Sequence, residues 1–239
     1  MLFGDAAVLV QLMRGQSRTG THAERLQAFY APQAARYDTF RDRLLHGRRE
    51  LIELLDPMPG DRVVELGGGT GANLDFFGLK RLRQLDRFEL VDICPALLDV
   101  ARRRSAQLEN VHIIVADAAS YQPQEPVDIV YLSYAVTMIP DWELAIENAI
   151  AMLRPGGKLG VVDFYVSSSD PPPGLARHDA LTRWFWPRWF VHDCVRLSSA
   201  HLATLLERLD VVTLLERKAR VPYLPGLRVP YYVFTGRKR

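Results

Sequence analysis

A glycine-rich turn constrains the fold of this chain more than any other feature. In VVELGGGTGANL (63–74), a β-branched run leads into glycines and then into residues that suit the start of a helix. Gly67 and Gly69 let the backbone turn tightly, and a helix that begins near Gly71 points its free N–H groups at a ligand. With Ala72 the turn also matches the G-x-G-x-x-A dinucleotide fingerprint, so the flanking residues must decide which ligand it serves.

Apolar runs alternate with helical patterns along most of the chain. Strands are expected at 62–66, 88–92, 111–117, 127–134 and 158–166, and helices at 95–106, at 141–153 and from near Ser198. Asp141 suits the N-cap of the second helix, and RPGG (154–157) suits a turn. Runs at 211–219 and 229–236 predict a closing hairpin. This alternation predicts an α/β fold with a mostly parallel sheet and helices on both faces.

Composition limits the classes of partner and location that this chain can have. With 30 Lys+Arg against 28 Asp+Glu, the net charge is +2, which favours no nucleic-acid partner. Cys94 and Cys194 show no metal-ligand spacing, so we expect no metal and a reducing, cytoplasmic setting. The sequence has no apolar run long enough to span a membrane. We predict an N-terminal helical cover at 1–56, a core at 57–239 and a lid-like insertion at 167–197.

Three acidic residues favour S-adenosylmethionine over a nicotinamide cofactor. Glu65 ends the first strand, where a carboxylate suits a ligand with an ammonium and a sulfonium and repels a pyrophosphate. Asp92 ends the second strand, placed to accept ribose hydroxyls, and Asp117 follows the third, placed to accept from an adenine amine. A helix cap or a solvated loop is the alternative for each acid taken alone. The predicted cofactor-binding residues are Glu65, Gly67, Gly69, Thr70, Gly71, Asn73, Asp92, Ile93, Asp117, Ala118 and Ser133.

These elements resemble the class I S-adenosylmethionine-dependent methyltransferases. Further stretches are similar to the methyltransferase domain of betaine lipid synthases, and they cover most of the chain from about residue 22: FYAPQAARYDTFR (29–41), LLHGRRE (44–50), LVDICPALL (90–98), SYAVTMIPDW (133–142), GVVDFYVS (160–167), TRWFWPRWFVHD (182–193) and VPYLPGLRVPYYVFTG (221–236).

The resemblance implies a Rossmann-like, seven-stranded sheet whose seventh strand lies between the fifth and the sixth. It implies three N-methylations of diacylglyceryl-homoserine, which give diacylglyceryl-trimethylhomoserine and S-adenosyl-L-homocysteine. The acceptor would come from a partner enzyme that transfers the aminocarboxypropyl group of S-adenosylmethionine to diacylglycerol. The chain would then act on a lipid at the inner face of the membrane.

Methyl transfer to an amine needs a neutral amine held in line in a dry site, and aromatic faces suit the quaternary ammonium product. Tyr134 follows the fourth strand and Tyr165 follows the fifth, so they rank first for this wall, with plain packing as the alternative. Asp141 could orient the amine if it is not a helix cap. The candidate catalytic residues are Tyr134, Tyr165, His46, Tyr37 and Asp163.

The segment RWFWPRWF (183–190) gathers aromatic and basic residues after the fifth strand. Pro187 is expected to break the segment near Trp186. We expect a lid that walls the headgroup pocket and dips into the membrane surface, with buried packing and a dimer contact as alternatives. The candidate substrate and membrane residues are Arg43, Arg183, Trp184, Trp186, Trp189 and Tyr231.

Two other functions fit the same sequence. The acceptor could be phosphatidylethanolamine, a quinone or a small amine. The chain could also be a subunit that binds S-adenosylmethionine without catalysis.

Overall fold

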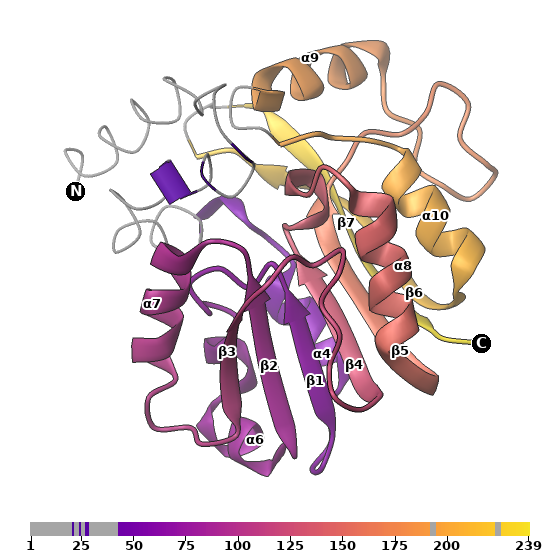
Figure 1. Cartoon of the computed structure of the whole chain (residues 1–239). Coiled ribbons are helices and arrows are strands. Elements are labelled where there is room, and N and C mark those ends of the chain that lie inside the picture. Colours follow the sequence, from indigo (N-terminus) through magenta and orange to yellow (C-terminus); the bar gives the residue numbers. More distant parts are fainter. Residues whose placement is uncertain (1–20, 22–23, 25–26, 29–42, 192–194, 223–225) are drawn as a thin grey trace.

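The structure, a computed structural model, describes residues 21, 24, 27–28, 43–191, 195–222 and 226–239. Its elements along the chain are α4 (Arg48–Leu55), β1 (Arg62–Leu66), α5 (Leu74–Phe77), α6 (Leu79–Gln84), β2 (Arg87–Asp92), α7 (Pro95–Arg104), β3 (Val111–Val115), β4 (Val127–Ser133), η1 (Val136–Met138), α8 (Trp142–Met152), β5 (Leu153–Phe164), α9 (Ala180–Phe190), α10 (Ala200–Arg208), β6 (Asp210–Arg220) and β7 (Arg228–Arg237) (Figure 1).

The strands form a seven-stranded sheet in the order β3-β2-β1-β4-β5-β7-β6. Strands β1 to β5 pair in parallel, whereas β7 lies between β5 and β6 and runs antiparallel to both. This confirms the predicted α/β class, the closing hairpin and the inserted last strand. Because all parallel strands point the same way, their carboxyl ends meet at one edge of the sheet.

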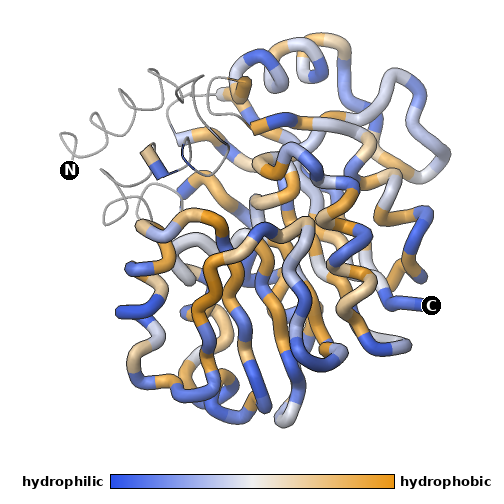
Figure 2. Tube along the Cα trace, in the orientation of Figure 1, coloured by the Kyte–Doolittle hydropathy of each residue, from blue (hydrophilic) through white to orange (hydrophobic). Residues whose placement is uncertain are grey.

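Helices cover both faces of this sheet, as predicted (Figure 1). On one face, Leu51 of α4 and Leu98 of α7 belong to one buried cluster. On the other face, Ile146 of α8 and Leu205 of α10 belong to a second buried cluster. Figure 2 shows the strands between them as mostly hydrophobic, as expected for strands that are buried on both sides.

Helix α4 lies closely against the sheet. A Cβ at Gly160 of β5 would meet side-chain atoms of Leu51 and Leu55 at 2.9 Å, so the absent side chain permits this approach. Lys158 Nζ donates to the Leu55 carbonyl at 2.6 Å. The predicted boundary between an N-terminal helical cover (1–56) and the core (57–239) stays a prediction. Farther towards the N-terminus, Thr21 and Glu24 exchange side-chain-to-backbone hydrogen bonds in the pattern of a capping box.

RPGG (154–157) is part of β5 but forms an irregularity in it. Leu153 lies opposite Val127 and Lys158 lies opposite Ile129, so the four residues between them bulge out of the pairing, and Gly156 has a φ of 75°.

One local expectation was wrong. Helix α9 continues through Pro187 instead of breaking near Trp186. Pro187 lies close to the end of this helix, and the flanking Trp186 and Phe190 are both buried against the body of the protein.

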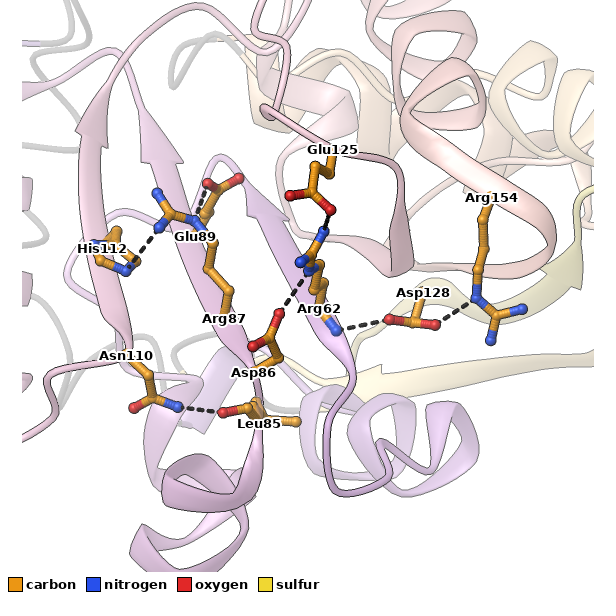
Figure 3. A network of polar contacts seen from close by, with 10 residues as sticks. All are labelled: Arg62, Leu85, Asp86, Arg87, Glu89, Asn110, His112, Glu125, Asp128 and Arg154. Carbon is orange, nitrogen blue, oxygen red and sulfur yellow. Dashed lines mark hydrogen bonds and ion pairs between the residues drawn. The ribbon is translucent and has the colours of Figure 1, made fainter.

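The opposite edge of the sheet, at the amino ends of the parallel strands, is rich in paired charges (Figure 3). Arg62 contacts both Asp86 and Glu125, and Arg87 contacts the buried Glu89 at 2.6 Å. Since these charges neutralise one another, they explain the polar surface there without a ligand. Among the described helices, none has the length and apolar character needed to cross a bilayer.

Candidate cofactor and acceptor site

A pocket opens at the carboxyl ends of β1, β2, β3 and β4. This is the edge at which open α/β sheets bind ligands. The residues that line the pocket are Gly67, Gly69, Asp92, Ile93, Cys94, Leu97, Ala116, Asp117, Ala118, Tyr134, Ala135, Met138, Ile139, Pro140 and Asp141.

The glycine turn forms one wall. Gly67 has a φ of 71°, and a Cβ there would lie 2.6 Å from the Cβ of Ala135. Its N–H donates to the Val91 carbonyl at 2.8 Å, which ties the turn to β2. The predicted helix start near Gly71 was wrong. With a φ of 70°, Gly71 lies in the left-handed region, and α5 begins only at Leu74.

Asp92 is held by backbone donors from two sides. Its Oδ2 accepts from the Gly69 N–H at 2.9 Å, and its Oδ1 accepts from the Cys94 N–H at 2.8 Å. These bonds fix the carboxylate in the pocket wall between the glycine turn and the first residues after β2. Each carboxylate oxygen can accept more than one hydrogen bond, so the group can still receive hydroxyls of a ligand.

Glu65 lies beneath the glycine turn and is 1% exposed. Its Oε1 accepts from Asn73 Nδ2 at 2.6 Å, and Asn73 Oδ1 accepts from Arg48 Nη1 at 3.4 Å. Its Oε2 has no hydrogen-bond partner among the described residues. Burial raises the pKa of Glu65 to about 7, although the hydrogen bond from Asn73 opposes this shift. Glu65 is not among the residues that line the pocket and faces Tyr131 of the neighbouring strand, so its contact with a cationic donor stays a prediction.

The other predicted cofactor residues divide into two groups. Ile93, Asp117 and Ala118 line the pocket, and the exposed Asp117 accepts from the Ala119 N–H through Oδ1 at 2.9 Å. Thr70 and Ser133 are buried and are not among the lining residues. Their predicted contact with a cofactor therefore has no support in the pocket itself.

Tyr134 lies in the pocket wall in a strained backbone conformation. Its φ of 55° is in the left-handed region, which a bulky residue seldom adopts. Its N–H donates to the Val162 carbonyl at 2.8 Å, and its ring centroid lies 4.6 Å from that of Phe164. Its hydroxyl donates to the His46 carbonyl at 2.7 Å. His46 thus reaches this tyrosine through its backbone.

Two candidate catalytic residues lie elsewhere. The Tyr165 hydroxyl donates to Glu216, and its ring packs edge-on against His178 and Tyr232, so its predicted place in the pocket wall was wrong. Asp163 is fully buried, accepts from Thr137 Oγ1 at 2.7 Å and so supports the chain after β4, and it is not among the residues that line the pocket. Tyr37 lies outside the described residues.

The predicted substrate and membrane residues differ in how exposed their side chains are. Trp184 and Trp189 are exposed, whereas Trp186 and Tyr231 are buried and cannot reach a membrane surface. Arg183 donates to the Ser168 carbonyl at 3.1 Å. Arg43 is exposed.

Sequence reasoning missed most of the wall that follows β4. Ala135, Met138, Ile139 and Pro140 line the pocket beside Asp141, which stands at the N-cap of α8 without a side-chain cap bond. Arg48 of α4 is also buried and faces Asn73, which in turn contacts Glu65. The feature of the sequence that could have predicted this wall is the mostly apolar run that follows the end of β4.

The residues fit the S-adenosylmethionine that the sequence predicts. Glu65 Oε2 would receive a positively charged group, Asp92 would receive ribose hydroxyls, and Gly67 and Gly69 bring the backbone of the glycine turn to the pocket wall. Leu97 and Ile93 add apolar surface to the same wall.

Comparison with known proteins gives a consistent result. A family model described as a methyltransferase domain matches residues 34–214. The chain is 32% identical over 147 residues to the ubiquinone/menaquinone biosynthesis C-methyltransferase UbiE of Vibrio vulnificus, a match that covers 58% of this chain and 56% of the relative. With the UbiE protein of Ectopseudomonas mendocina it is 30% identical over 175 residues, which cover 69% and 67%. The chain thus spans little more than half the length of the first of these relatives.

Solved structures share the fold at low sequence identity. The N-methyltransferase NodS of Bradyrhizobium japonicum, in complex with S-adenosyl-l-homocysteine, has a TM-score of 0.63 at 18% identity and covers 89% of this chain and 97% of its own. The [4+2]-cyclase SpnF has a TM-score of 0.66 at 16% identity and covers 92% and 97%. Since one neighbour is a cyclase, the fold alone does not determine the reaction.

Proposed function

The chain belongs to the methyltransferase domain family whose model matches residues 34–214; it is an S-adenosylmethionine-dependent methyltransferase, and we propose that its acceptor is the amine of diacylglyceryl-homoserine. Three N-methylations would convert this lipid into its trimethylated betaine form. When bound, S-adenosylmethionine supplies an electrophilic methyl group. The chain's own residues must bind and orient the amine and exclude water.

The charge of the pocket wall carries this proposal. Among the lining residues that the structure describes, the ionisable side chains are those of Asp92, Asp117, Asp141, Cys94 and Tyr134, and none is a lysine, arginine or histidine. Such a wall attracts ammonium groups and disfavours phosphates, so the carboxylate of the homoserine group would have to be bound by a residue outside this lining. Asp141 lines the pocket beside the apolar Met138–Pro140 and would orient an incoming amine.

Tyr134 supports the same acceptor. Its ring lies in the pocket wall, and its hydroxyl is engaged by the His46 carbonyl. An aromatic face that is fixed in this way can contact a methylated ammonium through cation–π attraction. The exposed Arg43 is a candidate partner for the carboxylate of the homoserine group.

A second candidate function is C-methylation of a quinone precursor. The observation in its favour is the 32% identity with a UbiE protein, although that match covers 56% of the relative. Both acceptors are carried by long apolar tails, so they place similar demands on the entrance to the pocket.

Product analysis separates the two functions. The purified protein is incubated with labelled S-adenosylmethionine and with detergent-dispersed diacylglyceryl-homoserine, phosphatidylethanolamine or a demethylated quinol, and the products are identified by mass. We expect mono-, di- and trimethyl products from diacylglyceryl-homoserine alone. Methylation of the quinol alone would establish the second function. Cofactor binding without turnover on any acceptor would indicate a non-catalytic subunit.

A further inference from the structure

The outward face of α9 is unusual for a surface helix. Residues 181, 184, 188 and 191 recur at helical spacing and point away from the body of the protein. Leu181 is 69% exposed, Trp184 is 54% exposed and Val191 is 58% exposed. Trp189, on the flank of this face, is 45% exposed. We call Leu181, Trp184, Trp189 and Val191, together with Arg188, the α9 face. Large apolar side chains that gather on one face in this way mark an interaction surface.

We propose that the α9 face docks on the surface of an anionic lipid bilayer. This inference deepens the proposed function and rests on it for its purpose, since a lipid acceptor must be taken from a membrane. The observations that carry it are independent of the acceptor's identity.

The helix is firmly attached through its opposite side. Trp186 is 2% exposed and Phe190 is 5% exposed, and the Phe190 ring stacks on that of Phe164 of β5 at 5.0 Å. At the start of the helix, Asp179 accepts from the Thr182 N–H at 2.8 Å. The α9 face is therefore presented by a rigid element.

The charge of the helix selects the kind of partner. Residues 180–190 contain two arginines and no carboxylate. The guanidinium of Arg188 lies 4.8 Å from the centre of the Trp184 ring, so a cation and an indole share one exposed position. Tryptophan at the interface and arginine at the lipid phosphates suit the headgroup zone of a bilayer. A symmetric contact between two copies would bring Arg188 near its own equivalent and is disfavoured.

The length of the helix defines how it would lie. Eleven residues give about 16 Å of helix, so α9 is too short to span a bilayer and would rest flat in the interface. Polar residues flank the helix on both sides in the sequence, and they disfavour insertion of either helix end into the bilayer core.

A row of aromatic rings connects the α9 face with the pocket. Trp189 stacks on Phe185 at 5.7 Å, and Phe185 meets Trp186 at 5.0 Å. Trp186 lies 5.8 Å from Phe190, which stacks on Phe164. Phe164 in turn lies 4.6 Å from the pocket residue Tyr134. A bilayer held at α9 would thus lie at the same edge of the molecule as the pocket (Figure 1).

Vesicle co-sedimentation tests the proposal without cofactor or acceptor. The full chain is mixed with vesicles of phosphatidylcholine or of phosphatidylcholine and phosphatidylglycerol, at low and high salt. We expect binding to the phosphatidylglycerol vesicles that weakens as salt rises. The double variant Trp184→Ala/Trp189→Ala should bind roughly tenfold more weakly, and Arg188→Glu should lose roughly tenfold on the anionic vesicles alone.

Matched controls lie elsewhere on the surface. Leu79→Ala removes a 57%-exposed leucine of α6 and should leave vesicle binding unchanged, as should Arg83→Glu on the same helix. Cofactor affinity, measured by calorimetry, should be the same in all variants and shows that they are folded. The proposal is overturned if the wild type does not bind the vesicles, if the control variants lose as much binding as the α9 variants, or if the α9 variants abolish self-association instead. Turnover on detergent-dispersed acceptor tests the proposed function separately.

Discussion

The hydroxyl of Tyr134 donates a hydrogen bond to the backbone carbonyl of His46, 2.7 Å away. These residues come from opposite sides of the glycine turn in sequence, and their bond closes the pocket wall at the end of β4. Burial raises the pKa of Tyr134, so the hydroxyl remains a donor over the physiological range.

Tyr134→Phe tests the role of this bond. The variant leaves the His46 carbonyl without its donor, so the free energy of unfolding should fall by about 1–2 kcal/mol. Turnover should fall further than cofactor affinity, because the ring in the pocket wall loses the bond that fixes its position. Tyr165→Phe is the matched control. It removes the bond to Glu216, away from the pocket, and should reduce stability without lowering turnover. Equal turnover losses in both variants would contradict the assignment.

Glu65 predicts a pH dependence of cofactor binding. Its pKa of about 7 means that the carboxylate gains its charge as the pH rises through neutrality. Affinity for the cationic cofactor should therefore rise roughly tenfold from about pH 6 to about pH 8. Glu65→Gln should bind more weakly at high pH and should lose this dependence. Calorimetric titration over the pH range checks it, and an unchanged slope in the variant would remove Glu65 from the binding site.

Asp92→Ala should weaken cofactor binding by roughly a hundredfold, because it removes a charged acceptor and the anchor of the Gly69 N–H. Asp86→Ala, at the opposite edge of the sheet, is the control and should bind normally (Figure 3). Circular dichroism distinguishes lost binding from lost folding. Normal affinity of the folded Asp92→Ala protein would argue against the cofactor site.

Asp163 predicts how stability varies with pH. Burial raises its pKa to about 6 in the folded protein, above the value of about 3.9 in the unfolded chain. The folded state therefore holds the proton more tightly, and this contribution is fully present below about pH 4 and is lost by about pH 6. It is on the order of 3 kcal/mol. Urea unfolding of the wild type and of Asp163→Asn should give a flatter pH profile for the variant; parallel profiles would contradict the prediction.

The two faces of α9 predict effects on stability of very different size. Trp186→Ala should lower the free energy of unfolding by about 3–5 kcal/mol, because it leaves a cavity against Phe190. Trp189→Ala, on the exposed side of the same helix, should change it by no more than about 0.5 kcal/mol. Denaturant unfolding measures both, and a large loss in the second variant would mean that Trp189 belongs to the core.

The sequence predicted the sheet well because strand ends and glycines are local signals. The positions of Asp92 and Asp117 in the pocket lining follow from the same signals, since Asp92 ends β2 and Asp117 lies two residues after the end of β3. Tyr165 was misplaced because successive strand residues point to opposite faces, and a sequence does not say which face meets the pocket. Phe164, one residue earlier, is the ring that contacts Tyr134.

Other features depended on contacts between distant residues. Arg48 reaches Asn73 from a helix that precedes the first strand, and no spacing in the sequence joins them. Pro187 was expected to end its helix from local sterics alone. The burial of Trp186 and Phe190 on either side of it is a tertiary effect that a segment of sequence does not reveal.

The close approach of α4 to Gly160 limits how this protein can be recombined with its relatives. Leu51 and Leu55 occupy the volume that any Cβ at residue 160 would need, although the residues lie about a hundred positions apart. A chimera that takes β5 from a protein with a larger residue there would push α4 outward, and with it the Arg48 that faces Asn73. Helix and strand must therefore be exchanged together.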